Sequence, residues 1–128
     1  MGEAQLVVDT DILIAYLNRR AYRHYLENPE TRVYYSAVTK KELLSKPGLK
    51  ASERRAIFAL LRRFRLVRID PRVSDAYSQL RVLHPSMARA DALVAASALA
   101  RRLPLLTGNL RHFRHVEGLA LLPAGPVQ

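Results

Sequence analysis

Acidic residues stand at three separate places where carboxylates could hold a metal ion. Asp9 follows the apolar run LVV, Glu42 lies in the segment SAVTKKELL, and Asp91 begins the apolar segment DALVAASALA. Three carboxylates brought close together repel one another unless some are protonated or divalent cations neutralise them. Oxygen ligands of this kind favour Mg²⁺ or Mn²⁺, which can activate water and stabilise charge on a phosphoryl group. If these acids converge, the expected chemistry is the hydrolysis of phosphodiester bonds.

Each of these acids also has an ordinary structural explanation when it is taken alone. An Asp between a strand and a helix most often caps the helix or forms a turn, and this applies to Asp9. Glu42 could be an exposed helix residue, and the helix dipole favours an acid such as Asp91 near a helix N-terminus. Asp91 is the most informative of the three, because an unpaired carboxylate in an otherwise apolar helix is costly. The functional interpretation therefore depends on whether the fold brings the acids together.

The apolar pattern predicts strands that alternate with helices, and these elements must position the acids. Strands are expected at 5–8, 32–35, 65–69, 105–107 and 119–122. Helices are expected from Ile12, with Thr10 or Asp11 as the cap, from Ser36 through Leu44, from Ser52 to about Arg63, and over 72–83, 87–102 and 110–113. This alternation predicts an α/β fold, a three-layer α/β/α sandwich with a mainly parallel central sheet. No linker or repeat divides the chain, so residues 1–128 are expected to form a single domain.

Parallel sheets of this kind place their sites beyond the carboxyl ends of the strands. Asp9, Ser36 and Thr107 each close an expected strand, so they should lie along one edge of the sheet. Glu42 and Asp91 lie close to helix starts that could face the same edge. The expected topology therefore offers a way for acids far apart in the sequence to meet.

Composition narrows the classes of chemistry and partner. The chain has no cysteine, which excludes disulfides, cysteine-based zinc sites and thiol catalysis. The 21 Lys and Arg residues exceed the 11 Asp and Glu residues, which gives a formal charge of +10. Such an excess suits RNA or DNA, but it could also simply make the surface soluble, and both interpretations stay open. No apolar run is long enough to cross a membrane, so we expect a soluble, cytoplasmic protein.

The motifs VVDTDILIAYL, SAVTKKELL and RADALVAASALARRLPLLTGNLRHF together resemble the PIN domain. They resemble in particular the single-domain VapC toxins of bacterial and archaeal toxin–antitoxin pairs. The resemblance extends from about Leu6 to Leu122 and is strongest from Asp91 to Phe113. It implies a PIN-like fold in which Asp9, Glu42 and Asp91 are the catalytic residues and the acidic metal ligands.

The resemblance also assigns auxiliary positions around these acids. The family's fourth position, commonly Asp, falls on Asn109, which can bind a metal through its carbonyl oxygen but brings no charge. Thr107 and Thr10 match hydroxyl residues beside the site. Asp11 stands where the family more often has Ser or Asn. It could add negative charge to the site or cap the following helix, and we favour the cap.

The resemblance implies a function that composition and spacing do not establish. It implies an endoribonuclease that depends on Mg²⁺ or Mn²⁺, cleaves RNA, forms a homodimer and is silenced by a cognate antitoxin protein. One metal ion or two would be compatible with the pattern. The RNA target is not implied beyond its class.

Two rival interpretations differ in class from a nuclease. The pair Asp9 and Asp11 also fits the D-x-D motif of haloacid dehalogenase-like phosphatases. That fold needs a Lys and further acids after a strand-terminal Ser or Thr, whereas Glu117 is the one acid after Thr107 and no Lys follows. The order of motifs therefore disfavours a phosphatase. A degenerate RNA-binding or scaffold domain of the PIN fold stays open because of Asn109, although the three retained acids argue against it.

Overall fold

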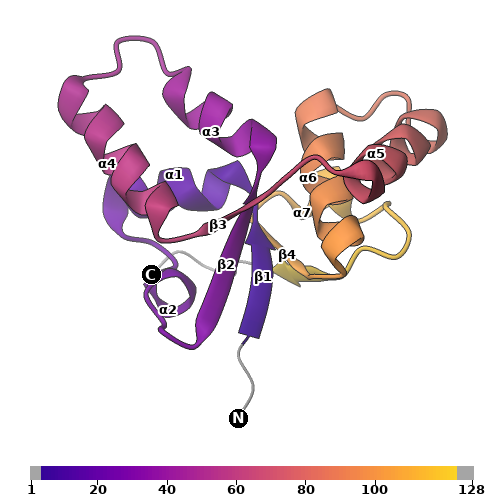
Figure 1. The fold of residues 1–128 in the computed structure, drawn as a ribbon, viewed down its shortest axis with the longest axis horizontal. Helices are drawn as coiled ribbons and strands as arrows, with labels where there is room; N and C mark the ends of the chain where they lie inside the picture. The colour runs from indigo at the N-terminus through magenta and orange to yellow at the C-terminus, as the bar shows by residue number, and fades with distance from the viewer. Residues whose placement is uncertain (1–3, 124–128) are drawn as a thin grey trace.

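Five short parallel strands form the central sheet of the computed structural model, which describes residues 4–123 (Figure 1). The strand order is β3-β2-β1-β4-β5, so β1 lies at the centre. The strands are β1 (Ala4–Val8), β2 (Thr31–Ser36), β3 (Arg65–Val67), β4 (Leu105–Thr107) and β5 (Leu121–Pro123). The helices are α1 (Thr10–Arg19), α2 (Arg23–Leu26), α3 (Ala37–Leu44), α4 (Ala51–Arg62), α5 (Pro71–Leu83), α6 (Arg89–Arg101) and α7 (Leu110–Phe113). The ends of the expected domain, residues 1–3 and 124–128, lie outside the described residues.

Helices cover both faces of the sheet. Helices α1, α3 and α4 lie on one side and α5, α6 and α7 on the other (Figure 1). Successive strand residues point to opposite faces, so Leu6 and Val8 join one core cluster while Val7 joins the other. In the same way Leu106 and Leu105 belong to different clusters. The expected α/β/α sandwich with a parallel sheet is therefore confirmed.

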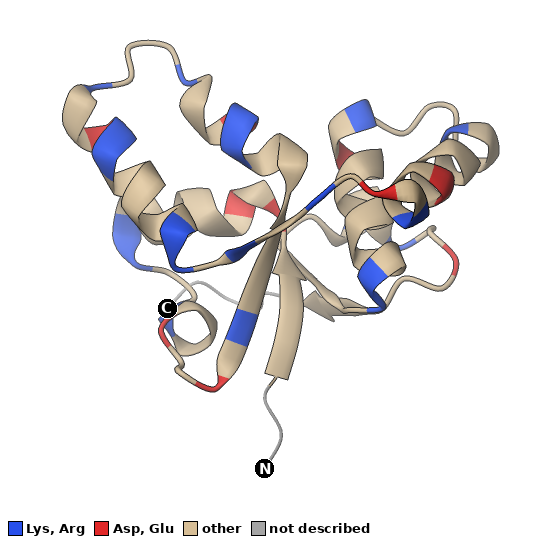
Figure 2. Ribbon diagram, viewed as in Figure 1, with Lys and Arg blue, Asp and Glu red and all other residues tan. Residues whose placement is uncertain are grey.

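Charged residues are spread over both helical layers rather than confined to one (Figure 2). Lys and Arg occur on α3 and α4 of one layer and on α5 and α6 of the other. No helix among the described residues is both long and apolar enough to span a membrane.

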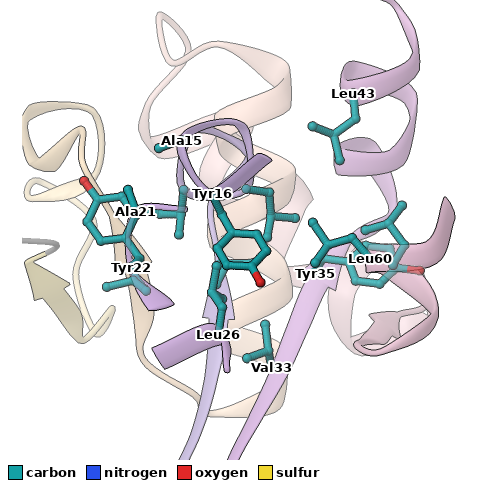
Figure 3. Close-up of a cluster of buried hydrophobic side chains, with 14 of the residues drawn as sticks. Ala15, Tyr16, Ala21, Tyr22, Leu26, Val33, Tyr35, Leu43 and Leu60 are labelled. Carbon is teal, nitrogen blue, oxygen red and sulfur yellow. The ribbon is translucent and has the colours of Figure 1, made fainter. Parts of the chain in front are cut away.

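The two cores are packed with side chains of different sizes. The cluster beneath α1 and α4 contains Tyr16, Tyr35 and Leu60 together with smaller residues (Figure 3). The other cluster contains four fully buried alanines of α6, which let that helix lie close to the sheet: Ala92, Ala95, Ala96 and Ala98. Helix α6 is the element that carries Asp91. Its apolar run therefore forms a buried helix, as the sequence predicts.

Some predicted boundaries are wrong, and local hydrogen bonds explain why. Helix α4 begins at Ala51 with Lys50 as its N-cap, rather than with Ser52, because the Glu53 carboxylate accepts a 3.1 Å hydrogen bond from the Lys50 amide. Helix α5 begins one residue earlier than predicted, because Asp70 Oδ1 accepts a 3.0 Å hydrogen bond from the amide of Val73.

Three further differences concern short or terminal segments. Strand β3 ends at Val67, where pairing with β2 stops, rather than at Ile69, which is exposed. Helix α6 begins at Arg89 rather than Met87, and the short helix α2 is absent from the sequence-based prediction. A four-residue helix has too little periodicity to be recognised from its apolar pattern.

Candidate functional site

The pairing of β1 with β4 places Asp9 beside Thr107. Val8 pairs with Leu106, so the next residues, Asp9 after β1 and Thr107 at the end of β4, lie at the same edge of the sheet. The Thr107 hydroxyl donates a 2.9 Å hydrogen bond to Asp9 Oδ2, and the Thr10 amide donates one of 2.9 Å to Asp9 Oδ1. Both carboxylate oxygens of Asp9 are therefore held in a fixed direction.

Asp9 is also the N-cap of helix α1, which is the structural role considered for it from the sequence. The alternative assignment of the cap to Thr10 or Asp11 was wrong, because the chain enters the helix two residues before Ile12. The helix begins at Thr10, and Asp9 keeps an extended backbone with φ of −75° and ψ of 154°. The structural and functional interpretations of Asp9 are thus compatible, since one carboxylate caps α1 and faces the sheet edge.

Burial and neighbouring charge disfavour the ionised form of Asp9. The side chain is buried, and its pKa is raised from 3.8 to about 7. Burial is the largest cause, followed by the charge of Asp11, and the charge of Asp91 adds a smaller effect. The hydrogen bonds from Thr107 and Thr10 act in the opposite direction. A bound cation would remove the cost of ionising Asp9.

Asp11 faces the site instead of capping the helix. It lies in the first turn of α1, and its Oδ2 accepts a 3.1 Å hydrogen bond from the backbone amide of Gly108. Its Oδ1 is buried and has no hydrogen-bond partner among the described residues. Burial raises the pKa of Asp11 as well. The alternative considered for this residue, added negative charge at the site, is therefore what the geometry supports.

Gly108 allows this contact because it has no side chain. A Cβ atom at this position would lie 2.7 Å from Asp11 Oδ2, which is closer than atoms of this kind approach. The sequence analysis missed Gly108. Its one signal was its position between Thr107 and Asn109, two residues already expected at the site.

Thr10 connects the sheet edge to helix α3. The Thr10 hydroxyl donates a 2.6 Å hydrogen bond to Glu42 Oε1 and lies 3.0 Å from the hydroxyl of Thr39, a buried residue that the sequence analysis did not single out. Ser36 caps α3, as predicted, by accepting a 3.4 Å hydrogen bond from the amide of Val38. Glu42 itself is exposed, so α3 brings its carboxylate to the border of the site rather than into it.

Asp91 approaches from the opposite helical layer. It lies in the first turn of α6, where the N-cap residue Ala88 has no capping side chain. Its partner is His112 on α7, whose Nδ1 lies 3.1 Å from Asp91 Oδ2. This contact between α6 and α7 could not be predicted from the spacing of residues in the sequence. His112 thus provides the partner that we expected for a carboxylate in an otherwise apolar helix.

Asn109 lies next to the site through its backbone. Its amide donates a 2.9 Å hydrogen bond to the Thr107 hydroxyl, which in turn donates to Asp9. The Asn109 side chain is exposed and makes no hydrogen bond to any residue within 4–123. It is free to turn toward a ligand.

The acids fit a divalent cation in kind and charge, but they do not yet form a complete set of ligands. Within residues 4–123, no Lys, Arg or His side chain is ion-paired with Asp9 or Asp11. Oδ1 of Asp11 is a further buried oxygen that has no hydrogen-bond partner among the described residues. No three acidic or histidine side chains in this part of the chain already stand close enough together to hold a metal ion. Glu42 is directed to Thr10 and Asp91 to His112, so binding requires them to reorient.

Comparison with known proteins gives a consistent result. The PIN domain family profile matches residues 6–119. Ribonuclease VapC10 of Mycobacterium tuberculosis is 33% identical over 121 residues, which cover 89% of this chain and 90% of that protein.

Solved structures with the same fold come from toxin–antitoxin systems. VapBC2 of Rickettsia felis, bound to a DNA fragment from its promoter, matches with a TM-score of 0.80 and 20% identity over 93% of this chain and 98% of that one. A toxin–antitoxin complex from Klebsiella pneumoniae matches with a TM-score of 0.74 and 24% identity over 93% and 97% of the two chains. At these identities the structural likeness demonstrates the shared fold.

Proposed function

This chain belongs to the PIN domain family, and we propose that it is an endoribonuclease that acts as the toxin of a toxin–antitoxin pair. One observation carries the proposal. The buried carboxylate of Asp9 is fixed at the carboxyl edge of the sheet, with the negative charges of Asp11 and Asp91 acting on it and no cationic side chain of the described residues paired to it. A carboxylate whose ionisation is disfavoured by burial and by neighbouring negative charges is suited to binding a cation.

We propose that Asp9, Glu42 and Asp91 hold Mg²⁺ or Mn²⁺, with Asn109 as an auxiliary ligand. Such an ion supplies Lewis acidity for the attacking water and the phosphoryl oxygens. The similarity to a ribonuclease and the carboxylate donors support this assignment. The number of ions is left open by these residues.

The neighbouring side chains orient the acids. Thr107 directs Asp9 Oδ2 and Thr10 directs Glu42 Oε1, so each hydroxyl restricts one carboxylate. Asp11 contributes negative charge and holds the turn at Gly108. Such preorganisation lowers the cost of aligning groups during the reaction.

RNA, an antitoxin and a second copy of the chain are the proposed partners. The charge of +10 supports binding to a polyanion such as RNA. Fold neighbours that are toxin–antitoxin complexes support an antitoxin partner for this chain. A homodimer stays a proposal that sedimentation or light scattering can test.

Cleavage of RNA with added Mg²⁺ or Mn²⁺ is the experiment that tests this function. We expect cleavage by the wild type and its loss in Asp9→Asn and in Asp91→Asn. Glu30→Gln is the matched control, because exposed Glu30 precedes β2 and so lies at the opposite, amino edge of the sheet. Cleavage that survives in both aspartate variants would show that the proposed site is wrong.

A degenerate RNA-binding or scaffold domain is the second candidate, and the uncharged Asn109 favours it. Titration with Mn²⁺ separates the two candidates. Binding that depends on Asp9 supports the nuclease, whereas RNA binding without specific metal binding supports the scaffold.

A further inference from the structure

A recess opens beside Asp91, between the loop that joins α5 to α6 and helix α7. Its volume is about 550 Å³, which lies within the range of pockets that hold small organic ligands. The walls include three histidines, one acid and apolar side chains from the loop: His84, Pro85, Met87, Asp91, His112 and His115. Because Asp91 belongs to both, the recess adjoins the candidate active site.

The histidine rings are arranged against one another rather than dispersed. The ring centroids of His84 and His115 lie 4.6 Å apart, and the ring planes meet at 78°. In an edge-to-face contact, the ring that presents its edge keeps both of its faces clear of the other ring. The third ring, His112, is held beside Asp91 by the 3.1 Å contact of its Nδ1.

The loop that forms one wall is held in place by Arg81. Its guanidinium donates hydrogen bonds to the carbonyl oxygens of Met87 and Pro85. Met87 is buried, so the apolar part of the wall is supported from behind. The recess is therefore largely formed before any ligand enters.

The chemistry of the walls suits one class of ligand. Ring faces and apolar surface favour a flat, unsaturated group such as a nucleic-acid base. Asp91 is the one acid in the lining, and the exposed cations Arg111 and Arg114 lie in α7 and at its C-cap, outside the lining itself.

A neighbouring cavity does not have the same character. It has a volume of about 920 Å³ and shares His84 and His115 with the recess, but its lining includes both Arg72 and Arg102 and the acids Asp75 and Glu117. This balance of charges gives no preference for a phosphate. The inference is therefore limited to the recess beside Asp91.

We propose that this recess binds the base of an unpaired RNA nucleotide adjacent to the scissile phosphate. The proposal rests on the proposed ribonuclease function. Stacking on His84 and His115 holds the base, and the position of Asp91 in the same wall brings the neighbouring phosphodiester to the acids. Substrates with an unpaired nucleotide at the cleavage site are thereby selected over continuous duplexes.

The test compares His84→Ala and His115→Ala with the control His24→Ala. His24 also packs against an aromatic ring, that of Tyr25, but lies on α2 outside this recess. With a single-stranded RNA substrate, we expect KM to rise about tenfold in the two recess variants with little change in kcat. His115→Phe should restore KM, because a phenyl ring can stack as well. Thermal unfolding by circular dichroism identifies any variant that fails to fold.

Equilibrium binding separates this inference from the proposed function. The binding of a fluorescent single-stranded oligoribonucleotide is measured by anisotropy for each variant, whether or not the wild type cleaves. Affinity lost in His115→Ala and regained in His115→Phe supports the recess even if no cleavage occurs. If the wild type cleaves but both alanine variants keep the KM and affinity of His24→Ala, the recess is not a base-binding site while the ribonuclease function stands. A failure of His115→Phe to restore binding would overturn the stacking contact.

Discussion

Asp9 and Asp91 lie at the same edge of the sheet, yet the fold treats them differently. Asp9 is buried, accepts hydrogen bonds at both oxygens and has its pKa raised to about 7. Asp91 is partly exposed, and its contact is with His112 on a short helix. The sheet thus holds one acid rigidly, while a helix start presents the other to the solvent side.

The difference indicates a division of tasks. A carboxylate such as Asp9, held rigidly where burial disfavours its ionisation, can fix the position of a cation. A carboxylate on the solvent side, such as Asp91, can adapt its position to the substrate. The recess beside Asp91 fits this division. The following predictions test it.

The largest expected difference is in catalysis. Asp9→Asn should reduce RNA cleavage by at least about a thousandfold at every Mn²⁺ concentration, because no other residue can occupy the fixed position. Asp91→Asn should cause a smaller loss, about a hundredfold, that excess Mn²⁺ partly restores. Rates measured across a Mn²⁺ titration provide the test. Equal rescue of the two variants would contradict the division of tasks.

The next effect concerns stability and pH in the presence of a chelator. The folded-state pKa of Asp9, about 7, lies above its ordinary value of 3.8, so between these pH values the folded state binds more protons than the unfolded state. The free energy of unfolding should therefore fall as the pH rises from about 4 to about 7, by about 1.4 kcal/mol per pH unit at most. Burial of Asp11 acts in the same direction.

Urea unfolding at several pH values measures this slope. Asp9→Asn should reduce the slope of the unfolding free energy against pH, and so should added Mn²⁺. Each removes the need to protonate the pair Asp9 and Asp11 in the folded state. The matched variant Asp91→Asn should reduce the slope only slightly, because the charge of Asp91 is a minor cause of the raised Asp9 pKa. A wild-type protein that gains stability over the same pH range relative to Asp9→Asn would show that the Asp9 pKa is not raised.

A smaller effect is expected at the turn beside Asp11. Gly108→Ala places a Cβ atom 2.7 Å from Asp11 Oδ2 and should cost about 1–3 kcal/mol of stability. Asp11→Ala in the same chain should relieve most of this cost, because it removes the clashing oxygen. A double-mutant cycle measured by urea unfolding gives the coupling between the two positions. Strictly additive effects would mean that the two residues do not touch.

The smallest effect is the stability change on Asp91→Asn. A partly exposed acid with one imidazole contact contributes little, so the free energy of unfolding at pH 8 should change by less than about 0.5 kcal/mol. Asp9→Asn measured under the same conditions should be more stable than the wild type. Matching changes in the two variants would remove the basis for distinguishing the two acids.

The sequence predicted what depends on strand ends and residue types. Asp9 and Thr107 could be expected to meet because each closes a strand of a parallel sheet, and the fold and family are confirmed. The roles of Asp9, Glu42 and Asp91 as metal ligands stay predictions. The structure places them around the carboxyl edge of the sheet, but Glu42 contacts the Thr10 hydroxyl and Asp91 contacts the His112 imidazole.

Contacts between distant backbone and side-chain atoms could not be predicted. The partner of Asp11 is an amide of the chain at Gly108, and nothing in local spacing distinguishes that contact from a helix cap. The contact between His112 and Asp91 depends on how α7 is oriented against α6, which a four-residue helix does not reveal. Both are properties of tertiary packing.

The insertion of β4 beside β1 also has a consequence during protein synthesis. Asp9 and Thr107 are 98 positions apart, and Asp11 and Gly108 are 97 apart. A ribosome releases Asp9, Asp11 and Glu42 well before it releases β4, the strand that carries Thr107 and leads to Gly108. A growing chain therefore carries these acids before β4 has paired with β1 to complete the carboxyl edge of the sheet. On the proposed function, the messenger RNA and the ribosome that make this protein face an ordered nuclease only after β4 has been released and has paired with β1.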